Sequence, residues 1–272
     1  MENQKTALKA QIIHAFTGHA KTGFAVSGNY ANGNPAAVVF LEDWLSDSAL
    51  LCMSQQLAQP VTAFLVECAE GYHIRWFSVD AEINLCGHGS LAAAACIFES
   101  SPENSVTLFS PHGTVVIHCD DDAYSMRMPA WQAVRHEQNW LDAKRLGLTP
   151  VDVYATRDLV IVLESVQQVL DYQPDFEQIK SLNHHHAVIL TAASGSGGYV
   201  LRNFVPNIGI DEDTATGSAQ CSLAPYWLEK LGQEQLEVDQ LSADGGYFRV
   251  SAAGEDILLT VKAEKKATVS LA

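Results

Sequence analysis

The chain carries the same pattern twice, and this internal repeat constrains its fold more than any other feature. In the first half, residues 75–77 (Arg-Trp-Phe) lead through acidic residues to Gly87, where an apolar segment begins. In the second half, residues 202–204 (Arg-Asn-Phe) lead through acidic residues to Gly217, about 130 residues further on. A chain of 272 residues is long enough for two cores. The repeat therefore predicts two similar α/β halves related by a pseudo-twofold axis, with a site in the cleft between them.

Local patterns predict the elements of each half. Residues 90–98, which are apolar or small throughout, predict a helix buried on all sides, and residues 219–231 are its counterpart. Ser46 is the expected N-cap of a helix over residues 46–57. The other expected helices are 139–146 and 176–182. Strands are expected at 12–16, 36–40, 62–67, 73–79, 106–109, 114–118, 124–128, 153–154, 159–163, 187–191 and 199–205, with turn-rich residues at 28–35. The aperiodic residues 129–137 predict a boundary between an N-terminal half, 1–129, and a C-terminal half, 130–272.

Composition and charge exclude several classes of protein. Hydrophobic residues make up 47% of the chain and charged residues 18%, which is typical of a packed globular protein and not of a disordered one. The formal net charge of -16 repels phosphate backbones and anionic lipids, so neither nucleic acid nor a membrane is an expected partner. No apolar run approaches the roughly 20 residues of a membrane span, and residues 1–16 lack a signal-peptide pattern, so we expect a cytoplasmic protein.

Metal and nucleotide motifs are weak in this sequence. The six cysteines are scattered without CxxC pairs, as expected for reduced thiols that pack mainly in the core. His184, His185 and His186 could bind a metal, but consecutive residues point in different directions and no carboxylate or thiol pattern surrounds them. These histidines are therefore expected in a solvated loop, without a metal. Residues 191–198 contain three glycines but not the spacing of a phosphate-binding loop, which predicts a flexible turn and no nucleotide cofactor.

Two turns contain the residue types that proton transfer needs. Each central helix begins at a glycine-containing turn, and the free N–H groups of two helix N-termini can hold a small anion. His88 lies in the first turn of one helix, whose positive end favours the neutral imidazole. Asp213 occupies the corresponding turn of the other half, so an acid and a base are paired. The alternatives are that Gly87 and Gly217 only allow tight turns and that His88 is a structural residue.

Several motifs together resemble a known family. They are residues 33–39 (Gly-Asn-Pro-Ala-Ala-Val-Val), 75–77, 82–88 (Glu-Ile-Asn-Leu-Cys-Gly-His), 213–219 (Asp-Thr-Ala-Thr-Gly-Ser-Ala) and 223–227 (Leu-Ala-Pro-Tyr-Trp). From Ile12 to the C-terminus the chain is similar to the phenazine-biosynthesis PhzF-like family. The resemblance implies the diaminopimelate-epimerase-like fold, an α+β architecture of two similar halves, each a curved mixed sheet around a central helix. It also implies a homodimer and a last strand, within residues 260–272, that returns to the first half.

The resemblance implies a function as well. Characterised members include an isomerase that moves a proton within a small cyclic acid without metal or organic cofactor, in a biosynthetic process. Carried over by motif, Asp213 and His88 take proton-handling roles on a small carboxylic acid. Gly87, Gly217 and Ser218 take substrate-binding roles.

Three positions depart from the patterns of related enzymes. The family's catalytic glutamate is replaced by Val61, and an arginine that usually precedes two glycines is replaced by Asp244. Cys86 stands where two-thiol epimerases keep one catalytic cysteine, but Thr214 is its expected counterpart in the second half, so that chemistry lacks a partner. Two functions remain open: a PhzF-like isomerase or epimerase, and a catalytically impaired protein that binds a small acid on the same scaffold.

Overall fold

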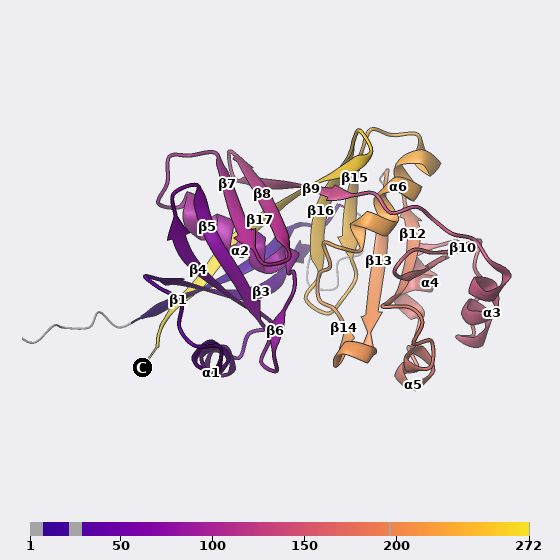
Figure 1. Cartoon of the computed structure of the whole chain (residues 1–272). Coiled ribbons are helices and arrows are strands. Elements are labelled where there is room, and N and C mark those ends of the chain that lie inside the picture. Colours follow the sequence, from indigo (N-terminus) through magenta and orange to yellow (C-terminus); the bar gives the residue numbers. More distant parts are fainter. Residues whose placement is uncertain (1–7, 22–28, 196, 272) are drawn as a thin grey trace, which may run out of the picture. The chain divides into compact units, whose positions relative to one another are not determined.

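The computed structural model describes residues 8–21, 29–195 and 197–271; Gly28 and Ser196 of two predicted turns and the terminal Ala272 lie outside these ranges. The chain divides into two compact units (Figure 1). The first unit comprises Met1–Ala15, Asn34–Met126 and Val261–Ala272, and the second comprises Phe16–Gly33 and Arg127–Thr260. The unit boundaries therefore fall inside three strands, β1 (Lys9–His19), β9 (Ala123–Pro129) and β17 (Asp256–Ser270).

The first unit is built on a mixed sheet. Its strands pair in the order β1–β3–β4–β5–β7–β8–β9, where β3–β4 and β5–β7 are parallel and the other pairs are antiparallel. The short strand β6 (Glu82–Ile83) adds to β5. The remaining strands are β3 (Asn34–Leu41), β4 (Thr62–Cys68), β5 (Gly71–Phe77), β7 (Ser105–Ser110) and β8 (Gly113–Asp120).

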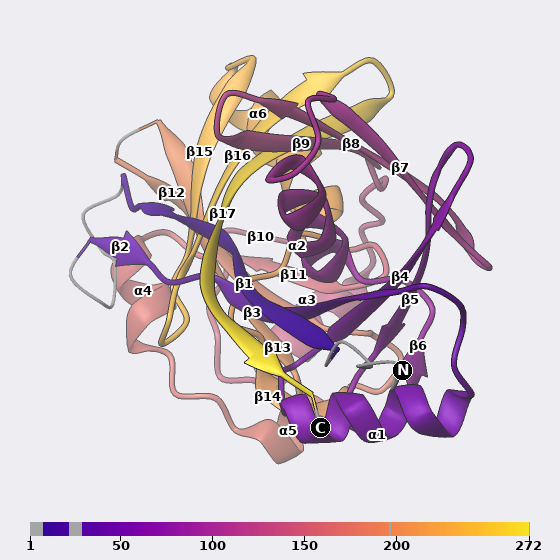
Figure 2. The same cartoon turned by 90° about the vertical axis from the view of Figure 1, so that its left-hand side faces the viewer.

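Helix α2 (Gly87–Phe98) lies against the strands of this unit, as Figure 2 shows. It contacts β3, β4, β7 and β8, and every residue from 89 to 97 is buried. Four consecutive alanines, residues 92–95, let strands pack closely around the helix because their side chains are short. The predicted helix buried on all sides is confirmed.

Helix α1 (Asp47–Leu57) also begins where the sequence predicts. The Oγ atom of Ser46 accepts a hydrogen bond from the Ala49 N–H at 3.3 Å, which caps the helix. The helix ends at Ala58, which has a left-handed conformation with φ of 50°. Its buried side chains Leu50 and Leu57 join the apolar core of the first unit.

The second unit repeats this plan with different residues. Its strands pair in the order β10–β11–β12–β13–β15–β16–β17, where β11–β12 and β13–β15 are parallel and the other pairs are antiparallel. The short strand β14 (Ile210–Glu212) adds to β13, and β2 (Tyr30–Ala31) pairs with the end of β1. The remaining strands are β10 (Asp152–Ala155), β11 (Leu159–Val162), β12 (Val188–Ser194), β13 (Gly198–Val205), β15 (Gln235–Gln240) and β16 (Gly246–Ala253).

The same sequence of parallel and antiparallel pairs occurs in both units, so the internal repeat is a repeat of topology. Helix α6 (Gln220–Leu231) packs on β13, β15 and β16 and corresponds to α2. The α+β fold of two similar parts, predicted from the repeat and the family resemblance, is confirmed at the level of each unit.

Three further helices cover the second unit. Helices α3 (Glu137–Arg145) and α5 (Phe176–Lys180) match the predicted helices, whereas α4 (Val166–Asp171) and the 3-10 turn η1 (Pro206–Ile208) were not predicted. The side chains of α3, α4 and α5 pack on an apolar core formed by the strands of this unit.

The six cysteines are free, and three of them are buried: Cys86, Cys96 and Cys221. None of the helices in the described ranges is long and apolar enough to cross a bilayer.

Candidate functional site

Helix α2 begins in a turn that brings a thiol and an imidazole together. Cys86 is the N-cap, and its Sγ accepts a hydrogen bond from the Gly89 N–H at 3.4 Å. The same sulfur lies 3.3 Å from Nδ1 of His88. The first N–H groups of a helix have no acceptor within the helix and carry partial positive charge. The turn therefore presents hydrogen-bond donors beside a group that can exchange protons.

The imidazole of His88 is neutral at physiological pH. Its environment lowers the pKa of His88 to about 4, and the physical cause is burial, which removes the water that would solvate the charged ring. The neutral state was predicted from the helix end alone, whereas the cause in the structure is burial. A neutral imidazole can donate one hydrogen bond and accept another, so His88 is suited to pair with a polar group of a substrate.

The two glycines of this turn differ in what surrounds them. A Cβ atom added to Gly89 would lie 2.9 Å from Cδ1 of Trp76 and 3.2 Å from Cγ1 of Val61, so the packing of the chain requires a glycine there. A Cβ added to Gly87 would meet no atom of the described residues within 4 Å, and its φ is not positive. Neither packing nor backbone conformation explains Gly87, and the space above it is open to a ligand.

Val61 occupies an informative position beside this turn. It precedes β4 and is fully buried, with Cγ1 next to Gly89 as described above. The residue expected in the place of the family's glutamate therefore lies against the first turn of α2. In this chain that position is apolar and cannot accept a proton.

In the second unit, Asp213 follows β14 and is held by a hydrogen-bond network. Thr216 Oγ1 donates to Oδ2 of Asp213 at 2.6 Å, and Gln240 Nε2 donates to the Asp213 carbonyl oxygen at 2.7 Å. The Oε1 atom of Gln240 accepts from the Thr216 N–H at 2.8 Å. Asn203 Nδ2 completes the network by donating to Thr216 Oγ1 at 3.0 Å. The bond from Thr216 fixes the orientation of the carboxylate. Gln240 and Asn203 come from β15 and β13, so the local sequence around Asp213 did not single them out.

Gly217 and Ser218 lie in the turn directly before α6, which begins at Gln220 and not at the predicted residue 219. A Cβ added to Gly217 would lie 3.1 Å from Cζ of Phe16 and 3.3 Å from Cδ2 of Leu259, so packing explains this glycine. Ser218 Oγ accepts a hydrogen bond from Nη2 of Arg157 at 3.3 Å. A cation thus stands beside the second turn, and it was missed because it lies far from the turn in sequence.

The register of the short strands shows which residues of the two turns correspond. Glu82 pairs with Phe77 on β5, and Glu212 pairs with Phe204 on β13. Gly87 and Gly217 each follow their glutamate by the same number of residues.

This correspondence matches Cys86 with Thr216 and His88 with Ser218. The prediction that Thr214 is the counterpart of Cys86 is wrong. Both side chains form a hydrogen bond within their own turn. Cys86 Sγ accepts from the Gly89 N–H, and Thr216 Oγ1 donates to the Asp213 carboxylate.

The predicted site residues divide between the units. Gly87 and His88 lie together in the first unit, and Asp213, Gly217 and Ser218 lie together in the second.

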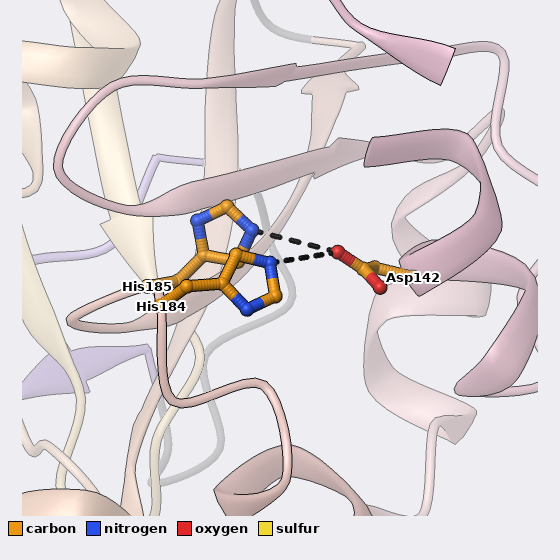
Figure 3. Close-up of side chains that lie close together, drawn as sticks. All are labelled: Asp142, His184 and His185. Carbon is orange, nitrogen blue, oxygen red and sulfur yellow. Dashed lines mark hydrogen bonds and ion pairs between the residues drawn. The ribbon is translucent and has the colours of Figure 1, made fainter. Parts of the chain in front are cut away.

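The three consecutive histidines follow α5, and two of them meet an acidic side chain. His184 and His185 turn their rings toward Asp142 of α3 (Figure 3). The prediction of a solvated loop is wrong for His185, whose side chain is only 7% exposed, whereas His186 is exposed. The carboxylate that the local sequence pattern lacks is supplied by a helix some 40 residues earlier.

Comparison with known proteins identifies relatives over most of the chain. The sequence profile described as "Phenazine biosynthesis-like protein" matches residues 24–267. A protein of Vibrio cholerae named an uncharacterized isomerase is 46% identical over 241 residues, covering 89% of this chain and 86% of that protein. A PhzF-family crystal structure from Enterococcus faecalis superposes with a TM-score of 0.87 at 30% identity, covering 98% of this chain and 100% of the other.

The fold extends to more distant proteins. A probable proline racemase from Agrobacterium radiobacter superposes with a TM-score of 0.61 at 10% identity, covering 97% of this chain and 93% of that one. At this identity the likeness concerns the fold alone. The matched profile, the sequence relatives and the shared topology together show that the chain belongs to the phenazine biosynthesis-like (PhzF) family.

Proposed function

We propose that this chain is an isomerase that moves a carbon-bound proton in a small carboxylic acid by general acid–base catalysis, without an organic cofactor. Relatives that share the family are named isomerases, which supports the reaction class. The observation that carries the proposal is a neutral His88 in the first turn of α2 together with a carboxylate, Asp213, that Thr216 holds before α6. Proton transfer to and from carbon requires an acid and a base, and these two side chains are of the types that supply them.

In this proposal Asp213 removes the proton from the carbon next to the substrate carboxylate, and the electron pair moves onto that carboxylate. The protonated Asp213 then delivers the proton to a second carbon over which the negative charge is delocalised, so that the proton changes position and none is gained or lost. His88 donates a hydrogen bond to the charge that develops on the substrate. The N–H groups at Gly87 and Gly217 and the hydroxyl of Ser218 bind the acid.

Arg157 supports the choice of an acidic substrate. The family's usual arginine position is occupied here by Asp244, which is exposed and negative. The guanidinium of Arg157 reaches Ser218 from a different strand connection, and Asp158 orients it through a hydrogen bond of 2.9 Å. The charge of Arg157 is paired with Asp158, and its guanidinium brings N–H donors beside the second turn, where a carboxylate can bind.

Deuterium uptake from heavy water tests the proposal. The protein is incubated in D2O with a panel of small amino and hydroxy acids, and uptake is measured by mass spectrometry. Asp213→Asn should abolish uptake, because the amide cannot accept the proton. The matched control is Asp211→Asn, an exposed residue of β14, which should retain it. Full uptake with Asp213→Asn would refute the assignment of Asp213.

Val61 favours a second candidate function, a small-acid-binding protein without turnover. Its buried apolar side chain replaces the family's proton acceptor at the α2 turn. Such a protein would bind a member of the panel, detected by calorimetry, and yet leave its carbon-bound hydrogens unexchanged.

The family resemblance also leads us to propose a homodimer in the cytoplasm. Light scattering coupled to size-exclusion chromatography tests the dimer.

A further inference from the structure

The cluster of Asp142, His184 and His185 lies outside the residues of the proposed reaction. Asp142 comes from α3, and the two histidines come from the loop between α5 and β12. Their ligand atoms, one from each residue, all lie within 4.8 Å of one another. Figure 3 shows both rings turned toward the same carboxylate oxygen. Two imidazoles and one carboxylate form a donor set that zinc commonly binds.

The distances suit a single ion. In a tetrahedral zinc site with metal–ligand bonds of about 2.1 Å, neighbouring ligand atoms lie roughly 3.4 Å apart. Here Nε2 of His184 lies 3.0 Å from Oδ2 of Asp142, and Nε2 of His185 lies 3.7 Å from the same oxygen. Both separations lie within a few tenths of an ångström of the ideal edge. All three ligand atoms lie within 4.8 Å of one another, so the two imidazoles would move together by up to about 1.4 Å around an ion.

The carboxylate is fixed by its surroundings. Asp142 is fully buried, and its Oδ1 atom accepts a hydrogen bond from Gln138 Nε2 at 2.8 Å. This bond leaves Oδ2 directed at the histidines, as outer-shell partners of metal ligands do. Arg145 also approaches Oδ1, at 3.9 Å, and its positive charge opposes a cation. Its side chain is 58% exposed, so solvent screens much of this repulsion.

His185 distinguishes a metal site from a simple hydrogen-bonded pair. A hydrogen bond at 3.0 Å between His184 and Asp142 accounts for those two side chains without an ion. It does not account for Nε2 of His185, which is buried and has no hydrogen-bond partner within the described ranges. The separation of 3.7 Å from Asp142 is too long for a hydrogen bond. A buried ring nitrogen without a hydrogen bond is costly, and a bound ion would satisfy it.

We propose that Asp142, His184 and His185 hold one divalent cation of the zinc class, with solvent as the fourth ligand. The side chain of His184 is 49% exposed, so the ion and a water molecule can reach the cluster from solvent. The bound ion ties α3 to the loop that leads into β12. The cluster contains none of the residues assigned to the proposed reaction, so the metal site stands independently of that reaction.

Zinc binding to the full-length protein tests the proposal, after the purification tag is removed and bound metal is stripped with a chelator. Zinc per chain is measured by elemental mass spectrometry after dialysis against zinc chloride, and affinity is measured by calorimetry. His184→Gln removes a half-exposed ligand without opening the core. The matched control is His186→Gln, which changes the neighbouring exposed histidine.

The wild-type protein and His186→Gln should each retain one zinc ion and gain thermal stability from it. His184→Gln should bind zinc at least about tenfold more weakly and lose the zinc-dependent rise in Tm. Cobalt in place of zinc should give the absorption of a tetrahedral site in the wild-type protein but not in His184→Gln.

Two results would overturn the proposal. The first is a wild-type protein that retains no zinc after dialysis. The second is equal zinc stoichiometry and affinity in the wild-type protein and His184→Gln, which would place any binding at other side chains. Asp142→Asn removes the charge but little volume; if circular dichroism shows that it folds, it should lose zinc as His184→Gln does, and undiminished binding would also count against the site.

Discussion

Arg202 and Glu212 form a two-point ion pair, with Nε to Oε1 at 2.9 Å and Nη2 to Oε2 at 2.8 Å. Arg75 and Glu82 form the same pair in the first unit, at 2.7 Å and 2.5 Å. Each pair joins a long strand to the short strand that leads into a glycine turn. Both units thus keep the arginine–glutamate pair that positions the turn, whereas the side chains of the two turns differ.

The two ion pairs should contribute unequally to stability. Arg202 is 13% exposed and also donates to the carbonyl oxygens of Val169 and Tyr172, so Arg202→Met should lower the free energy of unfolding by about 2–4 kcal/mol. Arg75 is 18% exposed, but its partners Glu82 and Asp47 are 37% and 81% exposed, so Arg75→Met should cost about 1 kcal/mol or less. Urea denaturation measures both; equal losses would contradict this difference in burial.

The lowered pKa of His88 predicts a loss of stability in acid. The unfolded chain has a histidine pKa of about 6.5 and the folded chain has one of about 4, so the unfolded state binds the proton first as pH falls. The contribution of His88 to the free energy of unfolding is therefore constant above pH 6.5 and decreases between pH 6.5 and 4, by up to about 3 kcal/mol. The partial exposure of the side chain makes this figure an upper limit.

Denaturation curves of the wild-type protein and His88→Gln across this pH range give the measurement. The variant lacks the titrating group, so its stability should depend less steeply on pH. Identical slopes for the two proteins would show that the folded-state pKa of His88 is ordinary.

Alanine at Gly87 and at Gly89 should have opposite effects. Gly87→Ala adds a Cβ where the described residues leave open space, and alanine favours a helix, so stability should be unchanged or rise by up to about 1 kcal/mol. Gly89→Ala forces a Cβ to 2.9 Å from Cδ1 of Trp76, and stability should fall by about 1–3 kcal/mol. If the open space at Gly87 binds substrate, Gly87→Ala should raise KM in the exchange assay. Stable folding with an unchanged KM would remove Gly87 from the binding site.

Val61→Glu tests whether the missing carboxylate limits catalysis. The new side chain would be buried beside Gly89, and burial would raise the pKa of its carboxyl group. The folded-state pKa of this glutamate would lie above its unfolded-state pKa. The free energy of unfolding of Val61→Glu, compared with that of Val61→Gln, should therefore decrease as pH rises from about 4 towards the folded-state pKa. Deuterium exchange should be faster with Val61→Glu than with Val61→Gln, which has similar size but no base. Equal rates in the two variants would mean that position 61 plays no part in proton transfer.

Features set by local sequence could be predicted, and those set by distant partners could not. The small residues of α2 and the Ser46 cap act within a single turn or helix, and both are confirmed. Helix α4 was missed although its signal is local: Ser165 and Gln168 form a capping box at its start. The segment is only six residues long, so its apolar periodicity is too short to recognise.

The candidate site shows the same division. Sequence motifs singled out His88 and Asp213 as candidates, but some of the groups beside the two turns come from elsewhere in the chain. Gln240 reaches Asp213 from β15, and Arg157 reaches Ser218 from the connection before β11. Contacts of this kind depend on which strands pair, and strand pairing cannot be read from a single sequence. The counterpart of Cys86 was misassigned for a related reason, because only strand register fixes the alignment of the two turns.

The division of the chain between its units has a consequence for synthesis on the ribosome. The second unit ends at Thr260, so all of its residues have been translated before residues 261–272 are added. Those last residues belong to the first unit, where the Leu271 N–H donates a hydrogen bond to the Leu8 carbonyl at 2.8 Å. The unit that begins the chain is therefore completed last. Until residues 261–272 are made, the nascent first unit lacks this segment, and we expect it to depend on chaperones during that time.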